Sequence, residues 1–446
     1  MKNNILRLLS AVLSLALLPA CLLCACKPGS NGGYAAPPQE FSRTPQPGES
    51  TGTPEPRLLT VVDKGEAKLE IVRPEEKTSG IMTRFGQALR TKLGNYFQTY
   101  FTLSEDWYNE NLSGVTPPKE RYEILIGATN RAESKAAISE LAAGEYIIRV
   151  TDRKVVIAGY DNNALAVALR YFFVEMCKYS DYSDSETNSL AFPIGLEVKK
   201  SAGASDLKSI IRSGSDLTGE LVSRVFKSSG GQYQYAQGGA CDGEYIYLVY
   251  MKNDVGVIKK VRMSDWTLVA TSEQINTGHG NDMTYDANNN RLVLVNMADN
   301  MITFISPETL GVIGTKKLNY PSYAIAYNTS TGGYAIASGG EILITNDKFE
   351  VSNRIPIRDF GFVGQGMDAD ANFIYLPQSA QSGVKNKTNI IQVYGWDGQY
   401  ITNVTVYTSI ESETVFHSGN DYYIYFNDAA YSAPEVYKVE FFRDFK

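Results

Sequence analysis

The chain has 446 residues, an apolar content of 43% and a formal net charge of −7. This length exceeds what a single hydrophobic core usually serves, so the sequence predicts two domains or a large repeat fold. The net charge becomes −9 when Lys2 and Arg7 of the N-terminal segment are left out, and such an acidic chain is not expected to bind nucleic acid.

The N-terminus has the layout of a secretory signal. Lys2 and Arg7 precede an apolar run, residues 8–23, that leads into the small-residue stretch LLCACKPGS. Pro19 within the run and this ending favour cleavage over a membrane-spanning helix. The leader is therefore predicted to be removed.

A lipobox-like motif ends the leader. The stretch Leu23-Cys24-Ala25-Cys26 resembles the lipobox of bacterial lipoproteins, which implies a signal peptide over residues 1–26 and acylation of Cys26. A second candidate motif ends at Cys21, and an ordinary secretory signal is a third interpretation. We expect an extracytoplasmic protein that is anchored by lipid to the outer face of the bacterial plasma membrane, or otherwise secreted.

Residues 27–57 are predicted to form a disordered linker. The segment is rich in Pro, Gly, Ser and Thr and nearly empty of aliphatic side chains. It cannot bury enough apolar surface to offset the entropy of ordering it. The linker would hold the folded part of the chain away from the membrane.

Residues 58–203 alternate strand and helix signals, which predicts a small α/β sandwich domain. The segments 68–72 and 122–129 are predicted strands, and residues 145–161 are a predicted hairpin that turns at Asp152-Arg153. Apolar residues at helical spacing run from Met82 to Phe97, after Ser79, and from Leu165 to Met176. Asn130, with Glu133 three residues on, is expected to cap a helix between them.

This domain has a recognisable order of elements. The stretch EILIGATNRAES followed by YIIRVTDRKVVIAGYDNNALAVALRYFF resembles the accessory domain that precedes the catalytic barrel in bacterial α-glucuronidases and β-N-acetylhexosaminidases. The resemblance implies a non-catalytic domain that accompanies carbohydrate-active proteins. No barrel pattern follows residue 200, so the glycosidase activity of those enzymes is not implied.

Residues 204–446 contain an internal repeat. A turn with Asp or Glu followed by a β-rich segment recurs at intervals of about 40 to 50 residues, the span of a four-stranded propeller blade. These outer segments are 215–226, 264–275, 306–318, 346–357 and 396–406. Between them, a polar turn leads into a short inner strand, a hairpin and a β-branched or aromatic strand. These inner segments are 237–250, 278–295, 321–337, 364–377 and 412–426.

The order of the segments predicts how the repeat closes. An outer segment comes first, and the last unit ends without one. We expect residues 219–227 to lie beside 435–442 and to complete the last sheet, leaving no open edge. The predicted fold is a multidomain chain in which the α/β domain is followed by a five-bladed β-propeller closed by its N-terminal strand.

The inner strands of such a propeller begin at its central channel, where polar side chains would converge. Residues that precede or open these strands are the candidate ligand-binding residues: His279, Asn281, Asp282, Gln365 and Glu413. Gln237 and Ser322 or Tyr323 occupy equivalent positions. Such side chains can hydrogen-bond a polar ligand, although they can also serve only the local backbone.

Two functions remain open at this point. The first is a non-enzymatic surface protein whose propeller binds a carbohydrate, a cell-wall polymer or a protein. The second is a carbohydrate-active hydrolase or lyase in which two of Asp282, Asp368 and Glu413 act as acid and base. The first is preferred, because none of these carboxylates lies in a recognisable catalytic motif.

Other residues give no site. His417 falls at a hairpin turn and is expected to lie on the surface, and the Asn-rich run 288–290 lacks the spacing of a calcium loop. Only Cys177 and Cys241 lie beyond the linker, and we expect both to be buried and unpaired. No cofactor and no metal site are predicted.

Overall fold

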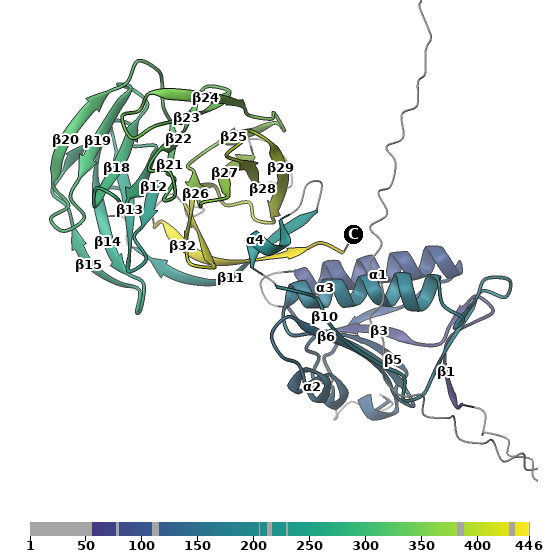
Figure 1. Cartoon of the computed structure of the whole chain (residues 1–446). Helices are drawn as coiled ribbons and strands as arrows, with labels where there is room; N and C mark the ends of the chain where they lie inside the picture. The colour runs from purple at the N-terminus through teal and green to yellow at the C-terminus, as the bar shows by residue number, and fades with distance from the viewer. Residues whose placement is uncertain are drawn as a thin grey trace, which may run out of the picture. The chain divides into compact units, whose positions relative to one another are not determined.

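The computed structural model describes residues 56–76, 80–108, 116–204, 206–211, 216–228, 231–380, 388–427 and 433–445. The predicted signal peptide with Cys21 and Cys26, the linker up to residue 55, and Ser79 lie outside the described residues. Residues 56–446 belong to one unit, in which an α/β part is followed by a part made of strands (Figure 1). Within the described ranges, no helix is both long and apolar enough to cross a membrane.

The first part of this unit contains two sheets. The larger has the strand order β10-β6-β7-β5-β3-β4, in which β3, β4, β5 and β7 run parallel, β6 is antiparallel to β7, and β10 is antiparallel to β6. Its strands are β3 (Glu70–Arg73), β4 (Leu103–Glu105), β5 (Glu123–Ile126), β6 (Glu145–Val150), β7 (Lys154–Gly159) and β10 (Glu197–Ser201). The smaller sheet, of order β2-β1-β9-β8, contains β1 (Leu58–Asp63), β2 (Glu66–Ala67), β8 (Ser183–Asp184) and β9 (Ser189–Pro193).

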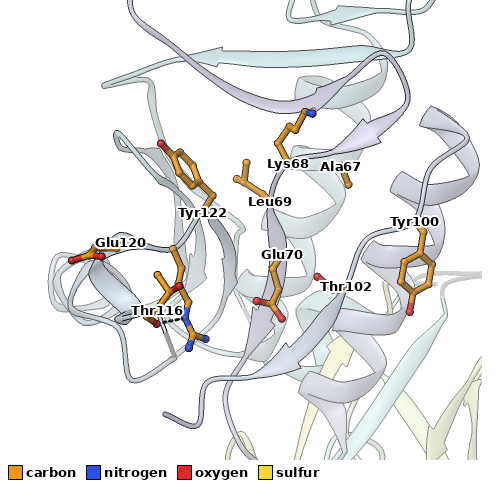
Figure 2. Close-up of a pocket in the computed structure, with 10 residues that line it drawn as sticks. Ala67, Lys68, Leu69, Glu70, Tyr100, Thr102, Thr116, Glu120 and Tyr122 are labelled. Carbon is orange, nitrogen blue, oxygen red and sulfur yellow. Dashed lines mark hydrogen bonds between the residues drawn. The ribbon is translucent and has the colours of Figure 1, made fainter. Parts of the chain in front are cut away.

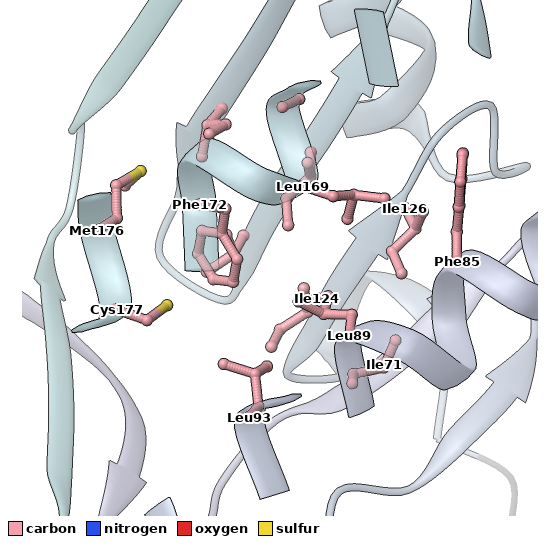
Figure 3. Close-up of a cluster of buried hydrophobic side chains, with 14 of the residues drawn as sticks. Ile71, Phe85, Leu89, Leu93, Ile124, Ile126, Leu169, Phe172, Met176 and Cys177 are labelled. Atoms are coloured by element: carbon pink, nitrogen blue, oxygen red, sulfur yellow. The ribbon is translucent and has the colours of Figure 1, made fainter. Parts of the chain in front are cut away.

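Helices cover both faces of the larger sheet. They are α1 (Ile81–Phe97), α2 (Ala132–Ser139) and α3 (Asn162–Tyr171), which continues as the π-helical segment η2 (Phe172–Lys178); a short 3-10 turn, η1, spans Pro118–Glu120. Ile124 and Ile126 of β5 point into the core formed with α1, α3 and η2, part of which Figure 3 shows. Leu125, between them, packs against Ala137 of α2 on the opposite face. This alternation along β5 produces a sheet that is buried on both sides.

Most local predictions for this part are confirmed, and one is wrong. Helix α1, helix α3 with η2, and the hairpin between β6 and β7 occupy the predicted segments. Asn130 does not cap α2: its backbone N–H and its Nδ2 both donate to Asp106, at 2.6 Å each, and Arg131 takes the N-cap position. The buried Arg131 guanidinium in turn lies 2.9 Å from the Glu123 carboxylate, so a tertiary ion pair outweighs the local capping pattern.

The two cysteines differ. Cys177 is buried in the core of the α/β part, as expected, and burial raises the pKa of its thiol well above the ordinary value. Cys241, at the end of a strand, is only partly buried. Neither of these described cysteines forms a disulfide.

The second part of the unit consists of strands, apart from the short helix α4 (Leu207–Ile210). Three four-stranded meanders are β12 (Tyr235–Cys241), β13 (Tyr245–Lys252), β14 (Val255–Arg262) and β15 (Thr267–Thr271); β17 (Asp282–Asp286), β18 (Arg291–Asn296), β19 (Met301–Ile305) and β20 (Val312–Lys317); and β21 (Ala324–Tyr327), β22 (Tyr334–Ser338), β23 (Glu341–Thr345) and β24 (Val351–Pro356). A short strand, β16 (Ile275–Asn276), pairs with β14. The protein is thus mostly β-sheet, as the sequence predicts.

A larger sheet contains the remaining strands. One half is β25 (Phe362–Gly364) and β26 (Asp368–Ala369), both paired with β27 (Phe373–Ala380), followed by β28 (Asn389–Gly395) and β29 (Tyr400–Val406). The other half is β30 (Ser412–Ser418), β31 (Asp421–Phe426), β32 (Glu435–Arg443) and β11 (Leu217–Lys227). The halves meet where three residues of β11 pair in parallel with β29.

The expected pairing of the first strand with the last is confirmed. Strand β11 runs antiparallel to β32, with Gly219 opposite Phe441 and Lys227 opposite Glu435. Strand β32 also pairs with β31 on its other side. A segment from the beginning of this part therefore supplies an outer strand to the sheet at its end.

Five strands contact one another in cyclic order: β12, β17 and β21, which open the three meanders, and β26 and β30 of the larger sheet. We call these five the first strands. β12 contacts β17, β17 contacts β21, β21 contacts β26, β26 contacts β30, and β30 contacts β12. Each is followed by a turn into the next strand, and side chains near the turn fix its shape. Asp242 and Asp370, for example, each accept two backbone N–H groups of the turn. Each also accepts the hydroxyl group of a tyrosine in the strand that follows, Tyr247 and Tyr375 respectively.

The end of β32 packs into the α/β core. Phe442 is 0% exposed, and its ring lies edge-on to that of Phe85 in α1, with 5.7 Å between the centroids. Phe445 belongs to the same cluster. The strand that pairs with β11 thus also contributes apolar side chains to the first part of the chain.

Replacing Phe442 with alanine should lower the free energy of unfolding of residues 56–446 by about 3 to 5 kcal/mol, because it leaves a cavity in a closed core. Val222, which is 41% exposed on β11, is the matched control. Its replacement with alanine should cost less than about 1 kcal/mol. Urea unfolding followed by fluorescence measures both changes, and equal losses would contradict the packing of Phe442.

Candidate functional site

A cavity of about 740 Å³ lies where the first strands begin; we call it the strand-start cavity. Residues before or at the start of the first strands supply Tyr235, Gln237, His279, Asn281, Tyr323, Gln365, Glu411 and Glu413. Residues at or just after the end of the second strands supply Met251, Met297, Gly339 and Asn427, and β25 and its neighbourhood add Val363 and Gly364. All these sheets therefore contribute the starts of their first strands or the ends of their second strands to the strand-start cavity.

The structure brings together four of the five predicted ligand-binding residues. His279, Asn281, Gln365 and Glu413 all line the strand-start cavity. The equivalent residues Gln237 and Tyr323 line it as well, whereas Ser322 is buried and does not. His279 is exposed at the mouth, without a hydrogen bond among those found for the described residues.

Hydrogen bonds fix the carboxyl side of this cavity. Asn427 donates from Nδ2 to Oε1 of Glu413, and its Oδ1 accepts the backbone N–H of Ala236 at 2.8 Å. Gln365 Nε2 donates to Oε1 of Glu411 at 3.3 Å. Burial raises the pKa of the Glu413 carboxyl well above its ordinary value, and the nearby charges of Glu411 and Asp282 act in the same direction.

Asp282 does not line the cavity, which corrects the expectation that it contacts a ligand. It is 0% exposed, and its Oδ2 accepts the backbone N–H groups of Ile325 at 2.9 Å and Met367 at 2.8 Å. Thr414 Oγ1 lies 3.2 Å from its Oδ1. The carboxyl group of Asp282, on β17, is therefore hydrogen-bonded to β21, to the residue before β26 and to β30, that is, to two other sheets.

Glycines make room for this carboxyl group. A Cβ atom at Gly238 of β12 would overlap the backbone of Asp282. One at Gly366 would overlap Thr414 Oγ1 and lie 2.7 Å from Asp282 Oδ1. These close approaches leave no space for a ligand beside Asp282, and only glycine fits at positions 238 and 366.

Burial raises the pKa of the Asp282 carboxyl well above its ordinary value, and this outweighs the hydrogen bonds from backbone N–H groups. The surrounding geometry can hold a proton on Oδ1, because Thr414 Oγ1 can accept it and donate onward to the Val415 carbonyl, 3.3 Å away. Oδ2 then still accepts the two backbone N–H groups. Asp282 is thus a structural group that links sheets.

A second, smaller cavity of about 220 Å³ lies where the first strands end, and we call it the strand-end cavity. Asp368, His417, Cys241, Thr284 and Tyr285 are among the residues that line it. His417 Nδ1 lies 2.5 Å from Asp368 Oδ2, and the ring stacks on Tyr422. The expectation that His417 decorates the surface is wrong, since only 19% of its side chain is exposed.

The pair of His417 and Asp368 favours the charged imidazole. Attraction by the Asp368 carboxylate raises the pKa of His417 above its ordinary value, although burial opposes the shift. No atom of the pair lies in the strand-start cavity. The imidazole is held by its partner and by Tyr422, which is the arrangement of a structural histidine.

The three carboxylates of the enzymatic alternative do not share a cavity. Glu413 lines the strand-start cavity, Asp368 lines the strand-end cavity, and Asp282 is sealed between buried groups. Acid and base catalysis on one glycosidic bond requires two carboxyl groups that face the same substrate. Among the residues that the structure describes, no group of three His, Cys, Asp or Glu side chains could hold a metal ion.

A third cavity, of about 540 Å³, lies in the α/β part (Figure 2). Tyr100 and Tyr122 lie at its two sides, with Glu70 between them. Its cations already have partners: Lys68 lies 2.6 Å from Glu66, and Arg121 Nε donates to the Thr116 carbonyl at 2.7 Å. The strand-start cavity is the larger of the two and gathers polar residues from all the sheets of the strand part, so it is the better candidate site.

Glu411, Asn427, Met251 and Met297 of the candidate site were not predicted. In an antiparallel hairpin, the end of the second strand lies beside the start of the first, so the residue after each second strand reaches the same mouth. The sequence shows these positions, because Met251, Met297 and Asn427 each come directly after a β-rich run, 245–250, 291–296 and 421–426 respectively.

No protein-family model matches the chain, and no curated protein matches it. Among solved structures, the glutaminyl cyclase of Myxococcus xanthus is similar over 52% of this chain and 99% of its own, at 9% identity and a TM-score of 0.39. The hydrazine synthase of Kuenenia stuttgartiensis is similar over 44% of this chain and 56% of its own, at 10% identity and a TM-score of 0.30. At these scores, neither structure assigns a fold or a function to the chain.

The Asp282→Asn variant should fold with a stability within about 1 kcal/mol of the native chain or above it, because an amide can accept the two N–H groups and donate to Thr414. The Asp282→Ala variant should lose about 2 to 5 kcal/mol, since two buried N–H groups lose their acceptor. Urea unfolding at neutral pH measures both, and equal stability of the two variants would contradict the linking role.

The same pair of proteins should differ in pH dependence. The folded native chain binds a proton at Asp282 more tightly than the unfolded chain does, so its stability falls as pH rises above the unfolded pKa of about 4. The advantage of Asp282→Asn over the native chain should therefore grow with pH. Unfolding curves between about pH 4 and pH 8 measure this, and a constant difference would show that Asp282 is ionised in the folded chain throughout.

Proposed function

We propose that residues 204–446 form a five-bladed β-propeller whose last blade is completed by β11. The support is the cyclic order of contacts among the five first strands and the pairing of β11 with β32. Residues 58–203 would then be a separate non-catalytic α/β domain, as the resemblance to the accessory domain of α-glucuronidases and β-N-acetylhexosaminidases implies. The packing of Phe442 would connect the two domains.

We infer that this propeller is a binding module for carbohydrate or a cell-wall polymer, carried by a lipid-anchored extracytoplasmic protein. The observation that carries the proposal is the composition of the strand-start cavity. Amide side chains line it together with tyrosine rings and methionines, among them Gln237, Gln365 and Tyr323. Planar hydrogen-bonding groups beside aromatic surfaces suit the hydroxyl groups and apolar faces of a sugar ring.

A hydrolase or lyase is the less favoured alternative. The cavity contains two carboxyl residues, Glu411 and Glu413, but Glu413 is hydrogen-bonded by Asn427 and buried to 5% exposure. Asp282 and Asp368, the other proposed acids, lie elsewhere. A protein partner at the same cavity would be the remaining interpretation if no saccharide binds.

Purified residues 56–446 should bind saccharides on a glycan array. The Tyr235→Ala and Gln237→Ala variants should weaken the binding of the best saccharide about tenfold, because they remove a stacking ring and a hydrogen-bonding group. Tyr100→Ala, which removes an exposed ring from the cavity of Figure 2, is the control and should have no effect. Absence of any saccharide binding would overturn the carbohydrate proposal. If only Tyr100→Ala weakened binding, the saccharide site would lie in the cavity of the α/β part instead.

The full-length chain expressed in a bacterium should incorporate a labelled fatty acid and partition into the detergent phase. Cys26→Ala should abolish both, because the thiol that carries the lipid is removed. Cys21→Ala is the matched control and should retain them. Labelling that is lost with Cys21→Ala but kept with Cys26→Ala would assign the anchor to Cys21, and a native chain without label would contradict a lipid anchor.

A further inference from the structure

We propose that the strand-start cavity selects saccharides that carry a primary amine, with the ammonium group held beside Glu411 and Glu413. This inference rests on the proposed function, since it names the class of saccharide that the same cavity takes. Three observations support it: the negative charge of the cavity, the hydrogen bonds that hold the two glutamates, and the burial of Glu413.

The charge of the cavity is one-sided. Glu411 and Glu413 both line it, and no lysine or arginine is found among its lining residues. His279, at the mouth, is the one histidine of the lining. A ligand with a carboxylate, sulfate or phosphate group would meet carboxyl groups with no cation beside them, whereas an ammonium group would be attracted.

Both acidic residues are held by the same neighbour. The backbone N–H of Asn427 donates to the Glu411 carbonyl at 3.1 Å, and its Nδ2 donates to the Glu413 carboxyl. Glu413 is further fixed by its carbonyl, which accepts the backbone N–H of Gly366 at 2.5 Å. Asn427 thus positions the Glu413 carboxyl group, and Gln365 Nε2, which donates to Glu411 Oε1 at 3.3 Å, positions the other. Groups that are positioned before a ligand arrives lower the entropic cost of binding.

The groups around this position are rich in acceptors. Each carboxyl group has two oxygens, and Gln365 already directs its Nε2 toward Glu411. An ammonium group supplies three donors and no acceptor, so it matches this set better than a hydroxyl group, which supplies one donor.

The electrostatics of Glu413 agree with this assignment. Burial, and then the charge of Glu411, raise the pKa of the Glu413 carboxyl, which means that negative charge at this depth is poorly compensated. A cation bound between the two groups would supply the missing compensation. Acetylation of the amine removes the charge and two of the donors, so it should weaken binding.

The test uses isothermal titration of residues 56–446 with three oligosaccharides of equal length: glucosamine, N-acetylglucosamine and galacturonate oligomers. Near pH 6, where the amine is protonated, the glucosamine oligomer should bind at least about tenfold more tightly than the acetylated one, and the galacturonate oligomer most weakly. Raising the salt concentration should weaken only the binding of the glucosamine oligomer appreciably.

The Glu411→Gln and Glu413→Gln variants should each reduce the ratio of the two affinities toward one. Glu186→Gln, which removes an exposed carboxylate from the α/β part, changes the net charge equally and should leave the ratio unchanged. Equal binding of the glucosamine and acetylated oligomers, or an unchanged ratio in both variants, would overturn the inference and leave carbohydrate binding in place. If none of the oligomers binds and the glycan array is also blank, the proposed function fails together with it.

Discussion

The buried carboxyl group of Asp282 is the interaction on which the β-sheet part of the structure depends. It extends from β17 and accepts the N–H groups of Ile325, in β21, and of Met367, just before β26. It also contacts Thr414 in β30, which lies in the same larger sheet as β26. Gly238, on β12, approaches its backbone so closely that no side chain fits there. The carboxyl group thus contacts two other sheets, and the backbone of the same residue packs against a third.

This central contact explains where a ligand can and cannot lie. The strand-start cavity and the strand-end cavity have separate linings, and Asp282 belongs to neither. Both oxygens of the Asp282 carboxyl group are taken up by Ile325, Met367 and Thr414, and the group is fully buried, so it does not face a ligand. Polar groups of the strand-start cavity precede the residues of this central contact by one position. Gln237 precedes Gly238, Asn281 precedes Asp282, and Gln365 precedes Gly366.

Much of the β-sheet part could be predicted from the sequence, because the signals are local. Alternation, β-branched residues and turn residues such as Asp242-Gly243 and Gly332-Gly333 mark strands and hairpins within short windows. The pairing of β11 with β32 followed from counting outer and inner segments. The convergence of His279, Gln365 and Glu413 followed from placing them at equivalent positions of a repeat.

The errors involve contacts between residues far apart in sequence. A short polar stretch such as GHGND does not reveal that Asn281 lines a cavity while Asp282, its neighbour, is buried, because that depends on Thr414, 132 residues away. His417 was misplaced since its partner Asp368 lies 49 residues earlier, on a different strand. Asn130 was assigned as a helix cap because the ion pair of Arg131 with Glu123 has no local signature. Which face a polar residue turns to, and what it meets there, is a tertiary property.

Amide hydrogen exchange at Ile325 and Met367 tests the central role of Asp282 most directly, since both backbone N–H groups donate to its carboxyl group. We predict that these two amides exchange only when the whole sheet part unfolds, as slowly as the most protected amides of its strands. Exchange at the rate of exposed turn amides, such as that of Gly243, would show that the carboxyl group does not link the sheets.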